Sequence, residues 1–316
     1  MTAKVFIDGA VGTTGLEIRD RLSTRPGVEL LVLPEDRRKD LEARRDALNS
    51  ADAVILCLPD PAAIEAVGLI ENSKVKVIDA STAHRTAEGW AYGFPELEPE
   101  QRQLLSSARL ISNPGCWATG FLALARPLVR KGLIPEVWPL SVHGVSGYSG
   151  GGKSMIAEFE DAASPDFTKE AFRTYGLGLN HKHLPEMRVH AGLEYNPLFS
   201  PSVGRFYRGM LVELPLNLWA LPQQPDPVDI HEALETAYEG EALVAVAPLE
   251  ESLGMTALDP EILAGTNGLK LFVFANGAGE QVRLVAALDN LGKGASGAAV
   301  QNLNIAMGWD ETAGLL

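Results

Sequence analysis

The first third of the chain alternates short apolar runs with amphipathic stretches. The apolar runs predict four strands, at 4–8, 28–33, 51–59 and 75–81. Residues 16–22 and 61–71 lie between these runs and predict helices. Strands that are apolar throughout are buried on both faces, and intervening helices imply parallel connections. The pattern therefore predicts an α/β fold whose first part is a Rossmann-like, doubly wound parallel sheet.

The pattern changes after residue 115. Further strand-like runs follow, at 138–147, 209–221, 269–276 and 281–290. Prolines within the second of these runs suit a mixed or antiparallel sheet. The tail is amphipathic, and we expect it to return to the first domain as a helix. We expect a dinucleotide-binding domain over 1–115, joined by a C-terminal helix at 297–316, and a catalytic domain over 116–296.

Composition narrows the functional classes. The chain has 316 residues, of which 46% are hydrophobic, so it can bury a sizeable core. Its net charge of -14 argues against nucleic acid as a partner, because phosphate binding needs a basic surface. A locally basic pocket can still hold an anion. The start MTAKVFIDGA does not resemble a signal peptide and no apolar run is long enough to span a bilayer, so we expect a cytoplasmic protein without membrane contact.

A glycine-rich turn, GAVGTTG, lies directly between the first predicted strand and its helix. Glycine allows the backbone to turn tightly and to approach a pyrophosphate at the start of the helix. The spacing is GxxGxxG rather than GxGxxG, and a tight turn without a ligand is the alternative. The expected cofactor contacts in this turn are Gly9, Val11, Gly12, Thr13, Thr14 and Gly15.

The segment after the second strand bears on the choice of cofactor. It reads PEDRRKD, where NAD enzymes carry an acidic residue for the ribose hydroxyls. Arg37, Arg38 and Lys39 favour NADP, because cations suit its 2′-phosphate, and Arg37 is the residue we assign to it. Glu35 and Asp36 lie in the same turn, so a solvated charged loop is the alternative.

Cys116 follows the turn residues Pro114 and Gly115 and precedes an apolar helical stretch. The segment therefore places its thiol at or near the first turn of a helix. Unpaired N–H groups and the positive end of the helix dipole favour the thiolate there, and the same groups can stabilise an oxyanion. The alternative is a small core residue, which is how we interpret Cys57 in its apolar strand.

Two histidines, His181 and His183, stand two residues apart in LNHKHLPE, shortly before Glu186. On an extended segment both rings would point to the same side, and one of them is suited to moving a proton. The spacing also fits a metal site, but no further ligands occur at suitable spacing, so no metal is expected. Ordinary surface histidines are the remaining alternative.

The segment GYSGGGKS, from Gly147 to Ser154, matches the P-loop pattern GxxxxGK[ST]. It follows a strand-like run and precedes a helix-like one, and Asp289 ends a strand that could hold magnesium. A nucleotide hydrolase that uses Lys153 is therefore an alternative function. It would leave the N-terminal glycine turn, Cys116 and the histidine pair without roles.

Several segments together resemble the N-acetyl-gamma-glutamyl-phosphate reductases, in particular their shorter (type 2) form. They extend over almost the whole chain and read GAVGTTG, IDASTAHR, YGFPEL, SNPGCWATG, HGVSGYSGGGK, HKHLPE, LAGTNG and DNLGKGASGAAVQNLN. The resemblance implies a second domain of the semialdehyde dehydrogenase α+β type. It also implies NADPH-dependent reduction of a small-molecule acyl phosphate, N-acetyl-glutamyl 5-phosphate, in arginine biosynthesis by a homodimer or homotetramer.

The resemblance also implies roles for individual residues. Cys116 would be the nucleophile that forms a thioester, and His181 the acid/base. The substrate contacts implied are Asn113, His183 and Glu186, and the contacts to the nicotinamide half of the cofactor are Ser146, Gly147 and Asn290.

One segment departs from the longer relatives, because DASTAHR stands where they read closer to DLSADFR. Ser81, His84 and Arg85 are expected there as contacts for the substrate or its phosphate, and Arg85 and Lys182 as cations for the leaving phosphate. The rival functions are an aspartate-semialdehyde dehydrogenase, the P-loop hydrolase and a non-enzymatic NADP sensor.

Overall fold

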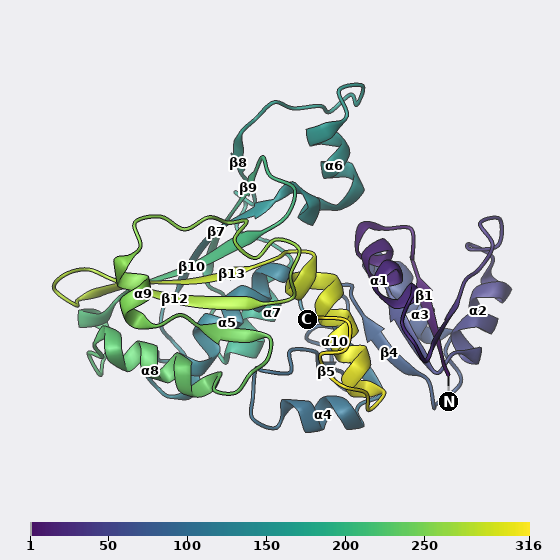
Figure 1. Ribbon diagram of the computed structural model, residues 1–316, viewed down its shortest axis with the longest axis horizontal. Coiled ribbons are helices and arrows are strands. Elements are labelled where there is room, and N and C mark those ends of the chain that lie inside the picture. Colours follow the sequence, from purple (N-terminus) through teal and green to yellow (C-terminus); the bar gives the residue numbers. More distant parts are fainter. Residues whose placement is uncertain (1) are drawn as a thin grey trace. The chain divides into compact units, whose positions relative to one another are not determined.

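The computed structural model describes residues 2–316, and the chain divides into two compact units (Figure 1). Unit 1 comprises Met1–Gly115 together with Ala295–Leu316, and unit 2 comprises Cys116–Gly294. The chain therefore passes twice between the units. Cys116 is the first residue after the first passage and Gly294 is the last residue before the second.

Unit 1 contains a parallel sheet of six strands in the order β2-β1-β3-β4-β6-β5. Its strands are β1 (Ala3–Asp8), β2 (Val28–Leu31), β3 (Ala53–Leu56), β4 (Lys76–Asp79), β5 (Ala91–Tyr92) and β6 (Leu110–Ser112). The order reverses between β1 and β3, and ligands of such sheets bind outside the carboxyl ends of the strands at this point. The third strand is shorter than the predicted 51–59 because Pro59 caps the helix that follows.

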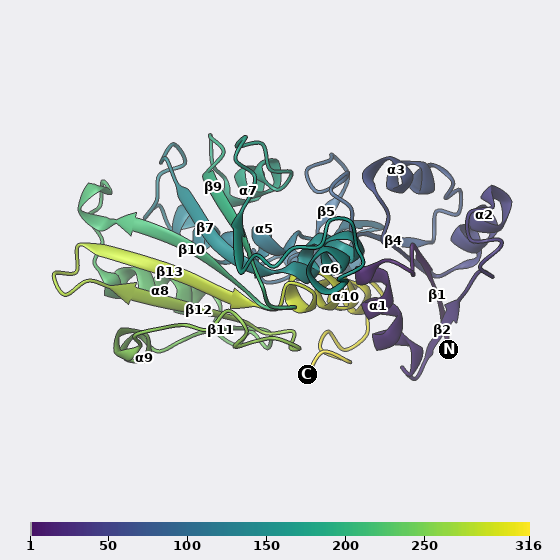
Figure 2. The same ribbon diagram turned by 90° about the horizontal axis from the view of Figure 1, so that it is seen from above.

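Helices cover both faces of this sheet (Figure 2). They are α1 (Thr13–Ser23), α2 (Leu41–Ser50), α3 (Asp60–Gly68), α4 (Gln101–Ser107) and α10 (Gly297–Ala306). Apolar residues of α2 and α3 pack with β1, β3 and β4 in one core, while α1 and α10 lie together on the other face. The polar side chains of α10 are buried too, and Asn302 donates to the carbonyl of Gly93 and to Asn113 Oδ1.

Unit 2 contains a mixed sheet of seven strands in the order β11-β12-β13-β10-β7-β9-β8. Its strands are β7 (Ser141–Gly147), β8 (Phe172–Thr174), β9 (Leu198–Gly204), β10 (Met210–Asn217), β11 (Val244–Val246), β12 (Leu269–Ala275) and β13 (Gln281–Leu288). In the centre of the sheet β10 pairs antiparallel with both β13 and β7, while the pairs β7·β9 and β11·β12 are parallel.

The helices of unit 2 are α5 (Cys116–Arg130), α6 (Gly152–Glu160), α7 (Leu184–Ala191), α8 (Pro227–Ala237) and α9 (Leu249–Gly254), with short 3₁₀ turns at Tyr148–Gly151 and Leu218–Ala220. A π-helical turn at Gly292–Ser296 spans the boundary at which the chain returns to unit 1. Helix α5 packs against β10 and β13 and also contacts α7 and α8. Its residues are almost all buried, and the absence of a side chain at Gly120 lets it approach the sheet closely, since a Cβ there would lie 2.5 Å from Val212 Cγ2.

These observations confirm the predicted fold class, a Rossmann-like parallel sheet accompanied by an α+β unit. In the described part of the chain, no helix combines the length and the apolar character that crossing a membrane requires.

Two helical glycines should respond in opposite directions to alanine. Gly120→Ala should destabilise the protein by about 1–3 kcal/mol, because the new methyl group would overlap Val212 in the packed core. Gly68→Ala, at the end of α3 with nothing within 4 Å of the added atom, should stabilise it by about 0.4–1 kcal/mol. Urea unfolding of the two variants measures both effects. A neutral Gly120→Ala would contradict the close packing of α5 on the sheet.

Candidate active site

The glycine turn after β1 is shaped by contacts of its own backbone. Gly9 has φ +89°, and a Cβ there would lie 2.3 Å from the carbonyl oxygen of Cys57. A Cβ at Gly15 would lie 2.4 Å from the carbonyl oxygen of Gly9. Gly12 has no such close neighbour, since the one atom near its added Cβ is 3.5 Å away. The first and third glycines are therefore needed for the fold, whereas the space beside Gly12 is available to a ligand.

The start of α1 offers donors to such a ligand. Gly12 precedes the helix and no side chain caps it. The first N–H groups of a helix have no partner within the helix, and together with the helix dipole they favour an anion. The hydroxyl of Thr13 is buried and has no hydrogen-bond partner among the described residues. These features fit the pyrophosphate of a dinucleotide over Gly12, Thr13, Thr14 and Gly15.

A cavity of about 520 Å³ lies beside this turn, at the carboxyl ends of β1 and β2. Its walls combine apolar side chains with both signs of charge, and they include Gly9, Val11, Arg19, Leu33, Glu35, Arg38, Lys39, Arg44 and Leu58. The size and lining suit an adenosine group. Arg37 is not part of the wall; it forms an ion pair with Asp40 at 3.3 Å. The neighbouring Arg38 and Lys39 occupy the position expected of it.

A buried ion pair joins β1 to α2 in this cavity. Arg44 donates from Nε and Nη2 to Asp8 Oδ2, at 3.2 and 3.0 Å, and from Nη1 to Glu65 at 3.1 Å. Burial raises the pKa of Asp8, and the hydrogen bonds from Arg44 oppose this rise. Neither residue was expected at the site, because they are far apart in sequence and only the packing of α2 against β1 brings them together.

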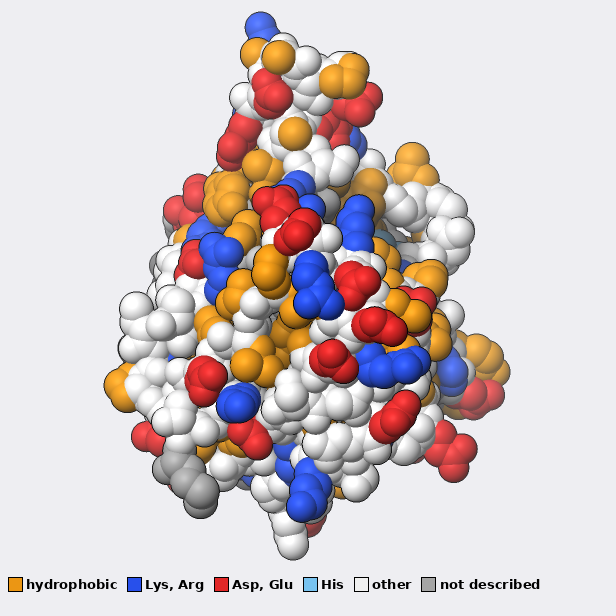
Figure 3. All heavy atoms as spheres, turned by 90° about the vertical axis from the view of Figure 1, so that its right-hand side faces the viewer, with side chains coloured by type: hydrophobic (Ala, Val, Ile, Leu, Met, Phe, Trp, Pro, Cys, Tyr) orange, Lys and Arg blue, Asp and Glu red, His pale blue; other side chains and the backbone are white. Residues whose placement is uncertain are grey.

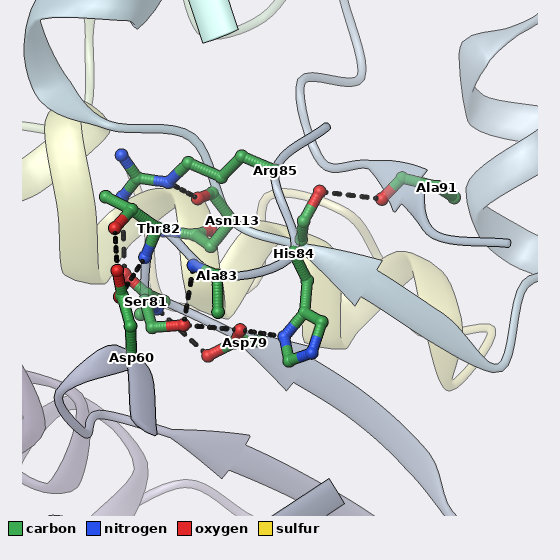
Figure 4. Close-up of polar contacts among 11 residues, drawn as sticks. Asp60, Asp79, Ser81, Thr82, Ala83, His84, Arg85, Ala91 and Asn113 are labelled. Carbon is green, nitrogen blue, oxygen red and sulfur yellow. Dashed lines mark hydrogen bonds and ion pairs between the residues drawn. The ribbon is translucent and has the colours of Figure 1, made fainter. Parts of the chain in front are cut away.

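A second polar group forms the turn after β4 (Figure 4). Asp79 is fully buried and its Oδ2 receives both the hydroxyl of Ser81 and Nδ1 of His84, each at 2.6 Å. The imidazole of His84 stacks on Trp90, with 4.0 Å between ring centroids. The hydroxyl oxygen of Ser81 also accepts from the N–H of Ala83. Ser81 and His84 therefore have defined roles in holding this turn.

Arg85 and Asn113 extend the same group across to the end of β6. Arg85 is buried, and it donates from Nε to the carbonyl of Asn113 at 3.0 Å and from Nη2 to that of Ala80 at 3.2 Å (Figure 4). The amide of Asn113 donates to Ala295 and accepts from Asn302. Asn113, which was expected to contact substrate, is thus buried and positions the segment that leads to Cys116.

Cys116 is the first residue of α5, in agreement with the prediction that its thiol stands at a helix start. The backbone of Gly294 packs closely beside it, because a Cβ at Gly294 would lie 2.7 Å from Cys116 Cβ. Cys116 is partly accessible to solvent. A nucleophile in this position combines access with the N–H groups of a helix end.

An aromatic cluster surrounds this end of α5 within unit 2. The indole of Trp117 donates to the hydroxyl oxygen of Tyr175 at 3.0 Å and meets Phe199 edge to face. The ring of His181 contacts both Tyr175 and Phe199, with centroid separations of 5.9 and 5.0 Å. Burial raises the pKa of Tyr175, and the thiolate charge of Cys116 raises it further. The cluster therefore packs His181 against Tyr175, whose hydroxyl is bonded to the residue that follows Cys116.

Tyr175 and Trp117 were not expected at the site. The one signal in the sequence for Trp117 is its position directly after Cys116. Its ring lies over β7, where Gly144 leaves room for it, since a Cβ there would lie 2.5 Å from the indole. Nothing in the sequence around Tyr175 indicates its partner.

The histidine pair is close in space, but not for the reason expected. The segment is not extended, because His183 has helical backbone angles and α7 begins at the next residue. The two rings meet edge to face at 4.8 Å, and Nδ1 of His181 accepts from the N–H of His183. Pro185 and Glu186 in the first turn are typical of a helix start and explain this difference. His183 and Glu186 are buried.

The glycine-rich segment after β7 does not form a P-loop. Its first half is a 3₁₀ turn at Tyr148–Gly151 that is bonded to a neighbouring loop, because the N–H groups of Gly147, Tyr148 and Ser149 donate to carbonyls of residues 206–209. Asp289, the expected magnesium ligand, is fully buried and forms an ion pair with Arg208 at 3.1 Å. The P-loop hypothesis is therefore wrong.

The expected nicotinamide contacts of unit 2 lie close to one another. Asn290 is buried, accepts from the N–H of Gly209 and donates to the hydroxyl of Ser149, both at 2.9 Å. A Cβ at Gly150 would lie 3.4 Å from both Asn290 Nδ2 and Ser146 Oγ. The structure thus brings Ser146, Gly147 and Asn290 together around one backbone turn. Over residues 2–316, no three His, Cys, Asp or Glu side chains are placed to hold a metal ion.

Comparison with known families assigns both units. Residues 4–104 match the model described as "Semialdehyde dehydrogenase, NAD binding domain", and residues 116–290 match "Semialdehyde dehydrogenase, dimerisation domain". The chain is 50% identical to N-acetyl-gamma-glutamyl-phosphate reductase 2 of Nostoc sp., over 99% of each sequence. It is 52% identical to N-acetyl-gamma-glutamyl-phosphate reductase of Brucella anthropi, over 98% of this chain and 99% of the relative.

Solved structures with the same fold are more distant in sequence. Aspartate semialdehyde dehydrogenase II of Vibrio cholerae, complexed with ASA, superposes with a TM-score of 0.72 at 14% identity, covering 97% of this chain and 98% of that one. Aspartate semialdehyde dehydrogenase of Francisella tularensis gives 0.69 at 14% identity, covering 97% and 100%. At this identity the likeness establishes the fold alone.

The two cysteines should differ sharply in reactivity. Both cysteines are partly accessible, but burial and the charges of Asp79 and Asp8 raise the pKa of Cys57 to about 12, so little of its thiolate forms at pH 8. Iodoacetamide at pH 8 should therefore label Cys116 and leave Cys57 unmodified, as peptide mass spectrometry would report. Cys116→Ser should take up no label until it is unfolded in urea, whereas Cys57→Ser should react like the wild type. Labelling of Cys57 in the folded protein would contradict this assignment.

Proposed function

Because the chain belongs to the semialdehyde dehydrogenase family, and within it to the N-acetyl-gamma-glutamyl-phosphate reductases, we propose that it reduces N-acetyl-glutamyl 5-phosphate to N-acetyl-glutamate 5-semialdehyde and phosphate. The observation that carries the proposal is Cys116 at the start of α5, in a chain half identical to such reductases from end to end. The reaction belongs to arginine biosynthesis, and we propose that it takes place in the cytoplasm.

In this proposal the thiolate of Cys116 attacks the carbonyl carbon of the acyl phosphate. The N–H groups at the start of α5 hold the developing oxyanion, and the C–O bond to phosphate breaks to leave a thioester. Arg85 and Lys182 are the candidate cations for the departing phosphate. His183 and Glu186, adjacent to His181 at the start of α7, are the candidate contacts for the rest of the substrate.

NADPH, when bound, supplies the hydride that reduces the thioester. The side chains of the protein then move a proton and stabilise the negative charge on the oxygen. His181 lies in the aromatic cluster next to Trp117 and provides a proton to the oxyanion that the hydride leaves. It takes the same proton back as the C–S bond breaks, which releases aldehyde and thiolate. Tyr175 is suited to stabilise that oxygen, because its hydroxyl oxygen is held by Trp117 and its hydrogen has no acceptor among residues 2–316.

The preference for NADP over NAD rests on charge in the unit 1 cavity. Arg38 and Lys39 line it, and Lys39 has no ion pair within the described chain. Arg38 forms an ion pair with Glu35 at 3.5 Å, and both side chains are exposed, so the guanidinium is also accessible to a phosphate. Cations in the segment after β2 favour the 2′-phosphate.

We also propose that copies of the chain associate through unit 2, as a homodimer or a homotetramer. The support is its match to a domain described as a dimerisation domain. A hollow of about 760 Å³ on its sheet, lined by Trp138, His143, Phe274 and Arg283 among others, marks a face that a second copy could cover.

The reverse reaction tests the proposed activity. With N-acetyl-glutamate semialdehyde, phosphate and NADP, the wild type should form NADPH, measured by its absorbance, only when phosphate is present. Cys116→Ser should lose this activity, because serine has too high a pKa to replace the thiolate. Its tryptophan fluorescence should still respond to NADPH, which serves as the control for folding.

Two results would overturn the proposal. Turnover by Cys116→Ser would exclude the thioester route. Activity with aspartate semialdehyde but not with the acetylated five-carbon substrate would assign the chain to the other branch of the family.

Tyr175→Phe should lower kcat about 10²-fold, a loss typical of removing one oxyanion donor, while KM changes little. Phe199→Leu, which alters the same cluster without touching the hydroxyl, should have a much smaller effect on kcat. An unchanged kcat in Tyr175→Phe would remove the tyrosine from the mechanism.

A further inference from the structure

The cavity of unit 1 concentrates positive charge in an acidic protein. Its wall contains four cationic side chains and two carboxylates, Arg19, Arg38, Lys39, Arg44, Asp8 and Glu35, whereas the whole chain has a net charge of -14. Figure 3 looks onto the side of the molecule that shows α1 and α2 in Figure 1, and acidic and basic side chains alternate there without a broad patch of one sign. Any selection for a phosphate is therefore made locally, by individual side chains of the cavity.

Arg44 differs from the other cations of this wall because it is held rigidly. Its side chain is 11% exposed, and three of its five N–H hydrogens are directed to Asp8 and Glu65. One hydrogen on each terminal nitrogen remains for a further acceptor, and hydrogen bonds between a guanidinium and a phosphate are strong because both groups are charged. Arg19, Arg38 and Lys39 extend from more exposed positions, so they lose more side-chain freedom on binding a ligand.

Asp8 explains why Arg44 is fixed in place. It is the last residue of β1, directly before the glycine turn, and its side chain is 7% exposed. A carboxylate is costly at such a position unless it is paired, and here both nitrogens of the fork donate to one of its oxygens. Asp8 Oδ1 accepts no hydrogen bond from Arg44, and the carboxylate occupies only the Nε and Nη2 side of the guanidinium.

We propose that Arg44 binds the 2′-phosphate of NADP and that Asp8 is its positioning residue, an inference that rests on the proposed use of a nicotinamide cofactor. Selectivity for NADP is then set from α2 and from the end of β1, in addition to the segment after β2. Lys39 adds a second, mobile cation, while Arg44 provides the directed contact. An adenosine without the 2′-phosphate forgoes that contact and binds more weakly.

Binding of two nucleotide fragments tests this without turnover. Isothermal titration of the full chain with adenosine 2′,5′-bisphosphate and with adenosine 5′-monophosphate reports the contribution of the 2′-phosphate as a ratio of Kd values. The wild type should bind the 2′,5′-bisphosphate at least tenfold more tightly. The double variant Asp8→Asn, Arg44→Met removes one charge of each sign and leaves no unpaired buried carboxylate.

This double variant should bring the ratio down at least fivefold while its Kd for the 5′-monophosphate stays within twofold of the wild type. Lys39→Met, which removes a charge without touching the pair, should lower the ratio less. If the double variant does not fold, as judged by thermal unfolding, Arg44→Lys keeps a partner for Asp8 and should still lower the ratio about threefold, because an ammonium lacks the fork.

The possible failures are distinguishable. A wild-type ratio near one would show that the cavity does not select the 2′-phosphate, which would overturn both this inference and the proposed preference for NADP. A wild-type preference that persists in the double variant would leave the cofactor proposal standing and would remove Arg44 and Asp8 from it.

Discussion

The close packing of α5 on the sheet of unit 2 fixes the position of the nucleophile. Two glycines allow this close packing, because they have no side chain at the contact. Gly120 of the helix lies against Val212, and Gly144 of β7 lies against the indole of Trp117. Because a methyl group added at either glycine would overlap its neighbour, the helix and the sheet are in close contact at both points, and the helix cannot shift without disturbing the sheet. The first turn of α5 is held accordingly, and the backbone of Gly294 packs closely against Cys116. The aromatic cluster with His181 and Tyr175 is built on the same turn.

Charge in this protein acts over short distances. The overall balance is strongly acidic, yet both functional groups of unit 1 organise cations by pairing them with buried carboxylates or carbonyls. Asp8 orients Arg44, and the carbonyls of Asn113 and Ala80 orient Arg85. In each case a side chain with many rotamers is fixed before any ligand arrives, which reduces the entropy lost on binding. Net charge therefore argues against nucleic acid as a partner but says nothing of phosphate recognition.

Local patterns in the sequence predicted what local physics determines. The apolar runs located most strands, and the glycine turn and Cys116 were placed correctly at helix starts because Gly and Pro restrict the chain within a few residues. Local patterns could not predict contacts between segments that are far apart in the sequence. The pairing of Asp8 with Arg44 depends on how α2 packs, and the match of residues 147–154 to a P-loop failed because carbonyls of residues 206–209 take up its N–H groups. Pro185 and Glu186 are local signals for the start of α7, and they exclude the extended segment that the spacing of the histidines suggested.

The contrast between the two cysteines affects how the protein responds to oxidation by peroxide. Peroxide converts an accessible thiolate to a sulfenic acid, which is rescued when a second thiolate attacks it to form a disulfide. The chain has just two cysteines, and burial raises the pKa of the Cys57 thiol to about 12. No thiolate of the same chain is therefore available to capture an oxidised Cys116 before further oxidation makes the damage permanent. Protection of the nucleophile must come from bound substrate or from the small thiols of the surrounding solution.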